Sequence, residues 1–171
     1  MKNYLESFRE EWEQIATEVG EIIRTEEKSL GISTVNFQKT LALHSDLFYS
    51  VSRAWARVFY FVKRIKQFEK ELSAEKGTEI RREPENFGIN KVTEGAVAEV
   101  LLMDKSLKSL VQLKYEAEET FDICSALKEA FEHRRSMLNN ITSLVGTGVF
   151  DGSEQSVDDY KSAVKRVRSK E

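Results

Sequence analysis

The sequence predicts an all-α fold in which two long helices pair as an antiparallel, coiled-coil-like hairpin. The 171 residues include one proline and eight glycines while 32% are charged, so long stretches lack helix-breaking residues. Apolar residues recur at alternating spacings of three and four over residues 36–74 and 104–145, which is the heptad pattern of coiled coils. One irregular stretch separates these two runs, so the second helix can fold back on the first.

An additional amphipathic helix is expected before the hairpin, from Asn3 to Ser29, within an acidic segment of residues 1–30. This segment carries 4 basic and 8 acidic groups. Gly31 is expected to end the helix, and Ser33 or Thr34 can cap the next one. One apolar stripe runs along the helix and must pack on another part of the protein, and it consists of Tyr4, Leu5, Phe8, Trp12, Ile15, Val19, Ile22 and Ile23.

The second helix, residues 36–74, has the most regular seam in the chain. His44 lies within it and is expected to be a buried histidine with satisfied hydrogen bonds, because the other histidine, His133, has no HExxH-like partner. The seam consists of Phe37, Leu41, His44, Phe48, Val51, Trp55, Val58, Val62, Ile65, Glu69 and Leu72.

Residues 76–94 contain Gly77, Pro84 and Gly88 and are predicted to form a long connecting loop. Thr93 is expected to cap a short helix over residues 94–103, and Asp104 or Ser106 to cap the last long helix. The seam of that last helix consists of Leu110, Leu113, Ala117, Thr120, Cys124, Leu127, Phe131, Arg134, Leu138, Ile141 and Val145.

The chain therefore divides into an acidic N-terminal helix (1–30), a hairpin core (31–145) and a flexible basic tail (146–171). Cys124 is expected to be a small buried hydrophobic residue. A two-helix hairpin leaves apolar surface that the first helix or other subunits must cover, so a homo-oligomer is expected. The side chains that need cover are Phe59, Phe61, Phe68, Tyr115, Phe121 and Met137.

No sequence motif indicates catalysis. The chain lacks a GxxxxGK[ST] phosphate loop, a GxGxxG fingerprint and a GxSxG elbow, and its glutamates do not stand three residues before a histidine. We therefore expect a protein that is not an enzyme and that uses no cofactor and no metal. The polar, acidic N-terminus does not resemble a signal peptide, and no apolar run is long enough to span a membrane, which predicts a cytoplasmic protein without a membrane partner.

The candidate binding site is a cationic stripe on the second helix. Residues 31–72 carry 7 basic and 3 acidic groups. With the seam facing the core, the outermost heptad positions carry cations and an aromatic ring, a combination that can neutralise phosphates and stack on bases of single-stranded nucleic acid. A basic face that neutralises neighbouring acidic helices explains the same residues. The outermost positions hold Arg53, Arg57, Tyr60, Arg64 and Gln67, and together with the flanking Lys63 and Lys66 these residues make up the stripe.

From about Asn36 to Ile141 the chain resembles the UvsY family, the recombination mediators of tailed phages. The resemblance rests on the basic, aromatic-rich segment RAWARVFYFVKRIK, an irregular link, the helix restart EVLLMDK and the segment FDICSALKEAFEHRR. Positions that match the family pattern are Val100, Leu101, Asp104, Lys105, Asp122, Cys124, Ser125, Ala130, Arg134 and Ile141. The acidic first helix and the basic tail depart from that pattern.

The resemblance implies a helical, ring-like homo-oligomer that binds single-stranded DNA. Such proteins help a RecA-type recombinase replace single-strand-binding protein on that DNA. The family's Lys/Arg motif is not reproduced letter for letter, and its nearest positions here are Lys63, Arg64 and Lys66, with Arg57 one to two turns earlier. A single-stranded DNA-binding recombination mediator is thus the leading hypothesis, and a coiled-coil scaffold or adaptor that binds other proteins is the alternative.

Overall fold

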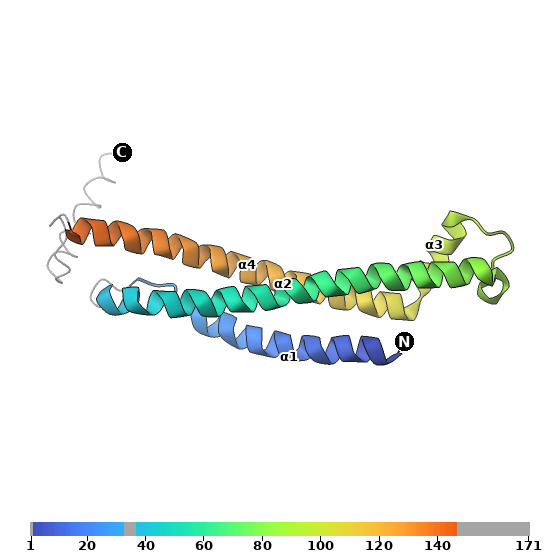
Figure 1. Cartoon of the computed structure of the whole chain (residues 1–171), viewed down its shortest axis with the longest axis horizontal. Helices are drawn as coiled ribbons and strands as arrows, with labels where there is room; N and C mark the ends of the chain where they lie inside the picture. Colours follow the sequence, from blue (N-terminus) through green and yellow to red (C-terminus); the bar gives the residue numbers. More distant parts are fainter. Residues whose placement is uncertain (1, 33–36, 147–171) are drawn as a thin grey trace, which may run out of the picture. The chain divides into compact units, whose positions relative to one another are not determined.

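The computed structural model describes residues 2–32 and 37–146, and all regular structure within them is helical (Figure 1). This confirms the all-α prediction. The expected caps Ser33 and Thr34, and the tail from residue 147 onward, lie outside the described residues. In chain order the elements are α1 (Lys2–Glu27), α2 (Phe37–Arg82), the 3-10 helix η1 (Pro84–Phe87), α3 (Glu94–Met103) and α4 (Lys105–Gly146).

These helices contribute to two compact units. The first unit comprises Met1–Gly20 and Ala54–Cys124, and the second comprises Glu21–Arg53 and Ser125–Glu171. Helices α1, α2 and α4 each supply a segment to both units, whereas α3 belongs to the first unit alone.

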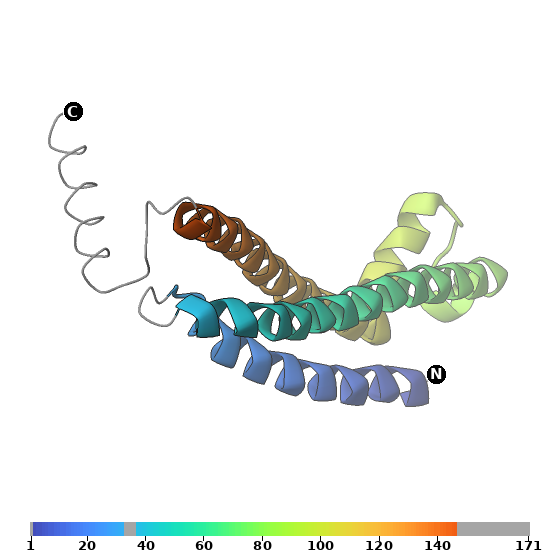
Figure 2. The same cartoon turned by 60° about the vertical axis from the view of Figure 1, so that its left-hand side comes forward.

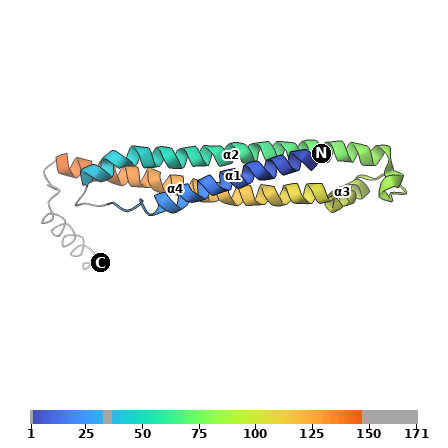
Figure 3. The same cartoon turned by 90° about the horizontal axis from the view of Figure 1, so that it is seen from below.

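In the first unit, α1 runs beside α2 (Figure 3). It packs on α2 through its apolar stripe, which was expected to be buried. Trp12, Ile15 and Val19 are all buried. The Trp12 indole stacks on Phe61, with ring centroids 5.1 Å apart, and Phe8 lies 5.1 Å from Phe68. Of the aromatic side chains that were expected to need cover, Phe61 and Phe68 are therefore covered by α1.

Segments of α2 and α4 also contact each other within the first unit, and the contacts run in opposite directions along the two helices. Trp55 and Phe121 lie 5.8 Å apart, the Nζ of Lys114 lies 2.8 Å from Glu69, and Lys76 pairs with Asp104. As residue numbers rise along α2, those of the partners fall along α4. Within this unit the two segments are thus antiparallel.

The predicted heptad register is confirmed by burial. On α2, Val51, Val58, Val62, Ile65 and Leu72 are all buried, and Val58 and Ile65 have no exposed surface. The seam of α4 is buried at eight positions, namely Leu110, Leu113, Ala117, Cys124, Leu127, Phe131, Arg134 and Leu138. Two predicted seam residues are exceptions, because Leu41 near the beginning of α2 and Val145 near the end of α4 are exposed. Burial raises the pKa of the Cys124 thiol to about 11, as befits a core residue.

The predicted long loop over residues 76–94 is wrong in its first part, because α2 continues to Arg82. Gly77 lies inside the helix, where a Cβ atom would lie 3.9 Å from both Val97 and Leu101 of α3. A methyl group would be at ordinary contact distance from these two side chains, so α3 restricts position 77 to a small residue. The apolar packing between the two helices offsets the low helix propensity of glycine. Ile80, one turn later, is buried with Ile89 and Val97.

The predicted caps of α3 and α4 are confirmed for Thr93 and Asp104. The Thr93 hydroxyl accepts a hydrogen bond from the Ala96 N–H at 3.2 Å, and Asp104 Oδ1 accepts one from the Leu107 N–H at 2.9 Å. Burial by itself raises the pKa of Asp104, but hydrogen bonds from Lys76 and from the Leu107 N–H outweigh it and lower the pKa. The carboxylate is therefore held ionised where α4 begins.

The end of α1, the first part of α2 and the last part of α4 contribute to the second unit (Figure 2). Its apolar core consists of Val51, Leu127 and Phe131, against which Ile23, Leu30, Leu47 and Phe48 pack. Next to it, Arg134 Nη1 lies 2.7 Å from His44 Nδ1, and both side chains are buried. His44 Nε2 has no hydrogen-bond partner within the described part of the chain. The expectation of a buried histidine is correct, whereas the expectation that its hydrogen bonds are all satisfied is wrong.

Candidate nucleic-acid interface

The predicted cationic stripe does not form one uncovered outer face. In the first unit, helices on either side of α2 pair with its cations. Arg57 forms an ion pair with Glu18 and Arg64 forms one with Glu11, both from α1. The expectation that all these side chains point away from neighbouring helices is therefore wrong. The reason is that the acidic α1 packs along this side of α2.

Lys66 lies at the opposite edge of the stripe and pairs with α4. Its Nζ is 2.7 Å from Glu118 Oε1. Gln67 Nε2 donates a hydrogen bond to Glu71 Oε1, at 2.7 Å, one turn along α2. Four of the seven predicted site residues, Arg57, Arg64, Lys66 and Gln67, thus already contact a carboxylate of this chain.

Tyr60 and Lys63 form the exposed centre of the stripe. Tyr60 is 65% exposed, and the Nζ of Lys63 lies 4.5 Å from the centroid of the Phe59 ring. Phe59 also makes an edge contact with Tyr60, at a centroid distance of 5.7 Å. In the described residues no ion pair of Lys63 with a carboxylate is found. This centre presents one cation and one aromatic face to solvent.

The remaining predicted residue, Arg53, is exposed, and it is the last residue of the α2 segment that belongs to the second unit. One further cation extends the predicted set along α2. This is Lys70, which lies two turns after Lys63 and is exposed in the first unit.

The arginines on the α1 side are partly exposed in spite of their ion pairs. The side chain of Arg57 is 40% exposed and that of Arg64 is 53% exposed. The Arg64 guanidinium also lies over two rings, 5.4 Å from the Phe8 centroid and 5.9 Å from the Phe61 centroid. Such ion pairs contribute about 0.2–1 kcal/mol, because water and salt screen them.

An apolar groove on the first unit was not predicted from the sequence. It has a volume of about 580 Å³ and lies among α2, α3 and α4. Leu102 and Tyr115 line it and are 74% and 59% exposed. Leu101, Leu107 and Val111 also line it, while Lys108 adds a charge. One signal for the groove was present in the sequence, since Tyr115 lies off the seam of α4.

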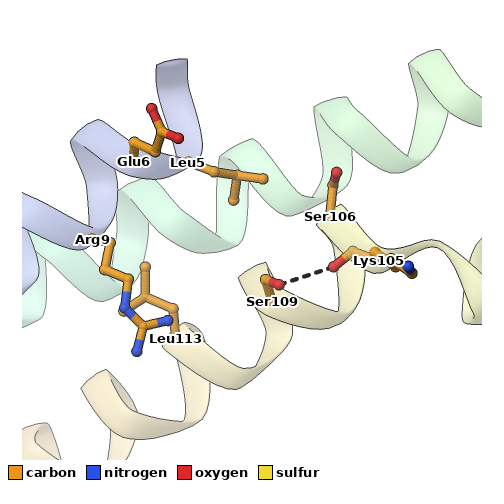
Figure 4. A pocket seen from close by; sticks show the side chains of 7 residues that line it. All are labelled: Leu5, Glu6, Arg9, Lys105, Ser106, Ser109 and Leu113. Atoms are coloured by element: carbon orange, nitrogen blue, oxygen red, sulfur yellow. Dashed lines mark hydrogen bonds between the residues drawn. The ribbon is translucent and has the colours of Figure 1, made fainter. Parts of the chain in front are cut away.

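A second, more polar hollow of about 330 Å³ lies where α1 approaches the beginning of α4 (Figure 4). Leu5, Glu6 and Arg9 come from α1, and Lys105, Ser106, Ser109 and Leu113 come from α4. The Ser109 hydroxyl donates to the Lys105 carbonyl at 3.0 Å, so it is used within its own helix.

Neither a membrane-spanning helix nor a metal site is found in the described residues. No helix in residues 2–32 and 37–146 combines the length and the apolar character that crossing a membrane requires. Over the same ranges, no three His, Cys, Asp or Glu side chains are grouped so that they could hold a metal ion.

Comparison with known proteins found no matching family model, no matching curated protein and no matching solved structure.

Proposed function

We propose that this protein binds single-stranded DNA through the outer face of α2 and acts as a recombination mediator. The observation that carries the proposal is the exposed pair of Tyr60 and Lys63, backed by the Phe59 ring. An aromatic face can stack on a base of any identity, and a neighbouring cation can neutralise the adjacent phosphate. Lys70 continues the positive surface along the same helix.

The mediator role follows from the resemblance to the UvsY family and extends the DNA-binding proposal. In this role the chain helps a RecA-type recombinase replace single-strand-binding protein on DNA. The two long helices form one continuous antiparallel hairpin, and several hairpins assemble into a homo-oligomer. In an assembly, many copies can contact one DNA strand at the same time. Their weak contacts reinforce one another, because after the first copy has bound, binding by the other copies is intramolecular.

DNA binding is tested with the full-length protein and a fluorescent oligo-dT, by anisotropy over a series of salt concentrations. Each phosphate contact to a single strand contributes about 0.7 to the slope of log affinity against log salt. We expect the double variant Lys63→Gln, Lys70→Gln to reduce that slope by about 1.4. Tyr60→Ala should weaken binding by about 1–3 kcal/mol with the slope unchanged, because it removes stacking and no charge.

The matched control is Lys39→Gln with Lys91→Gln, which removes the same charge from exposed positions outside the stripe. This variant should bind like the wild type. Absent or salt-insensitive binding by the wild type would refute the proposal. The mediator step is measured separately, as a shorter lag before a RecA-type recombinase hydrolyses ATP on DNA coated with single-strand-binding protein.

The apolar groove favours one alternative, an adaptor that binds an amphipathic helix of another protein. Leu102 and Tyr115 could take the apolar face of such a helix, and Lys108 would favour an acidic flank. An adaptor predicts no salt-dependent binding of oligo-dT. It also predicts a protein complex that survives nuclease treatment and that Leu102→Ser with Tyr115→Ser dissociates.

A further inference from the structure

The acidic side chains of α1 match the cations of α2 at the same spacing. Glu11 and Glu18 are seven residues apart on α1, and their partners Arg64 and Arg57 are seven residues apart on α2. Seven residues span two helical turns, about 10.5 Å, so the two ion pairs repeat along the contact between the helices. These two carboxylates therefore form ion pairs with the cations on one edge of the predicted DNA-binding stripe.

The two ion pairs contribute little to holding α1 in place. Trp12, Ile15 and Val19 are 5%, 3% and 0% exposed, and burying side chains of this size contributes about 1.5–3 kcal/mol each. Each exposed ion pair contributes about 1 kcal/mol at most. The apolar stripe therefore holds the helix, and the carboxylates stay next to the arginines whether or not they form ion pairs.

Both arginines can reach an external ligand without any movement of α1. Their side chains are 40% and 53% exposed, so part of each guanidinium group faces solvent. A phosphate that approaches from solvent competes with a tethered carboxylate for the same N–H donors. The tether gives the carboxylate a high local concentration, which a dilute ligand must overcome.

We propose that α1 is a built-in competitor of DNA, in which Glu11 and Glu18 occupy Arg64 and Arg57 in place of two phosphates. The inference rests on the proposed function, because it concerns the same surface of α2. It predicts that the wild type binds single-stranded DNA with two phosphate contacts fewer than its cations would allow. Neutralising the two carboxylates should make both arginines available.

The test compares the full-length wild type with Glu11→Gln, Glu18→Gln in the same anisotropy titrations with oligo-dT. Two further phosphate contacts should steepen the salt slope by about 1.4. The ratio of the variant's affinity to the wild-type affinity should then rise about sevenfold when salt is lowered from about 200 mM to about 50 mM. Circular dichroism of each variant checks that helix content and melting are unchanged.

The matched control is Glu10→Gln with Glu21→Gln, which removes the same charge from exposed positions of α1. Neither glutamate forms an ion pair with another described residue. This control should keep the slope of the wild type. Adding Arg57→Gln and Arg64→Gln to the Glu11, Glu18 variant should return its slope to the wild-type value.

Two outcomes would overturn the inference while the proposed function stands. In one, the wild type binds in a salt-dependent way and Glu11→Gln, Glu18→Gln leaves the slope unchanged. In the other, both glutamate pairs steepen it equally, which would indicate a general effect of net charge. If neither the wild type nor any variant binds, both the proposed function and the inference fail.

Discussion

At the scale of single residues, His44 and Arg134 place a polar contact where a heptad seam ordinarily carries apolar side chains. Both are buried in the second unit, and Arg134 Nη1 lies 2.7 Å from His44 Nδ1. Desolvation lowers the pKa of His44 below its ordinary value of 6.5, and the charges of Arg134 and Arg135 lower it further. The imidazole is therefore neutral at neutral pH, which suits a partner that is already a cation.

This contact predicts a pH-dependent stability. Below about pH 6.5 the unfolded chain binds a proton that the folded chain, with its lowered pKa, does not bind. The free energy of unfolding should therefore fall as pH decreases through 6.5, until the folded-state pKa is reached. Urea unfolding between about pH 8 and about pH 5.5 measures this loss.

His44→Gln is the control for the pH prediction, because its amide oxygen can accept from Arg134 and the side chain does not titrate. The variant retains the exposed His133, so the difference between the two pH profiles reports His44 alone. Profiles of equal steepness would contradict a neutral, desolvated His44.

At the scale of elements, Gly77 lies where α3 packs on α2. A Cβ at this position would lie 3.1 Å from Arg81 Nη1, and 3.9 Å from Leu101 and Val97. Arg81 is the flexible neighbour, since it is exposed and ends in a guanidinium that binds Glu94 at 2.7 Å. A methyl group can therefore fit after a small movement of Arg81, whereas a longer side chain meets the apolar face of α3.

Two substitutions of Gly77 should consequently have opposite effects. Gly77→Ala should raise the free energy of unfolding by up to about 1 kcal/mol, because alanine has the higher helix propensity. Gly77→Leu should lower it by about 1–3 kcal/mol, because the side chain displaces Val97 and Leu101. Urea unfolding gives both values, and hydrogen exchange of α3 should rise in the leucine variant alone. Equal tolerance of alanine and leucine would show that α3 does not pack closely on Gly77.

At the scale of the whole molecule, the net charge of −3 conceals a separation of charge along the chain. The acidic residues of the first 30 positions and the basic residues of α2 meet in the first unit, through Glu11 with Arg64 and Glu18 with Arg57. Part of the positive charge that the sequence offers to a polyanion is therefore neutralised within the chain.

The proposed assembly predicts the mass of the particle in solution. Light scattering and mass photometry should give a multiple of the chain mass of 19.7 kDa, with and without oligo-dT. A particle of one chain mass under both conditions would contradict a homo-oligomer. DNA binding by a single chain would still be tested by the anisotropy titrations.

The sequence by itself determined the helices, the heptad register and the caps Thr93 and Asp104. These features depend on periodicity and on contacts within a few residues, so each can be predicted locally. The end of α2 could not be predicted in this way. Glycine at position 77 ordinarily indicates a break, and only the packing of Ile80 against Val97 and Leu101 of α3 explains why the helix continues there.

Only the tertiary structure decided which members of the cationic stripe remain exposed. Heptad positions assign Arg57, Tyr60 and Arg64 to the outer side of α2, with Lys63 beside them, but they do not say where a third helix packs. The apolar stripe of α1 covers Phe61 and thereby brings Glu11 and Glu18 to the two arginines, while Tyr60 and Lys63 stay exposed. Charge composition fixes how many cations a chain has, whereas long-range packing fixes which of them a ligand can reach.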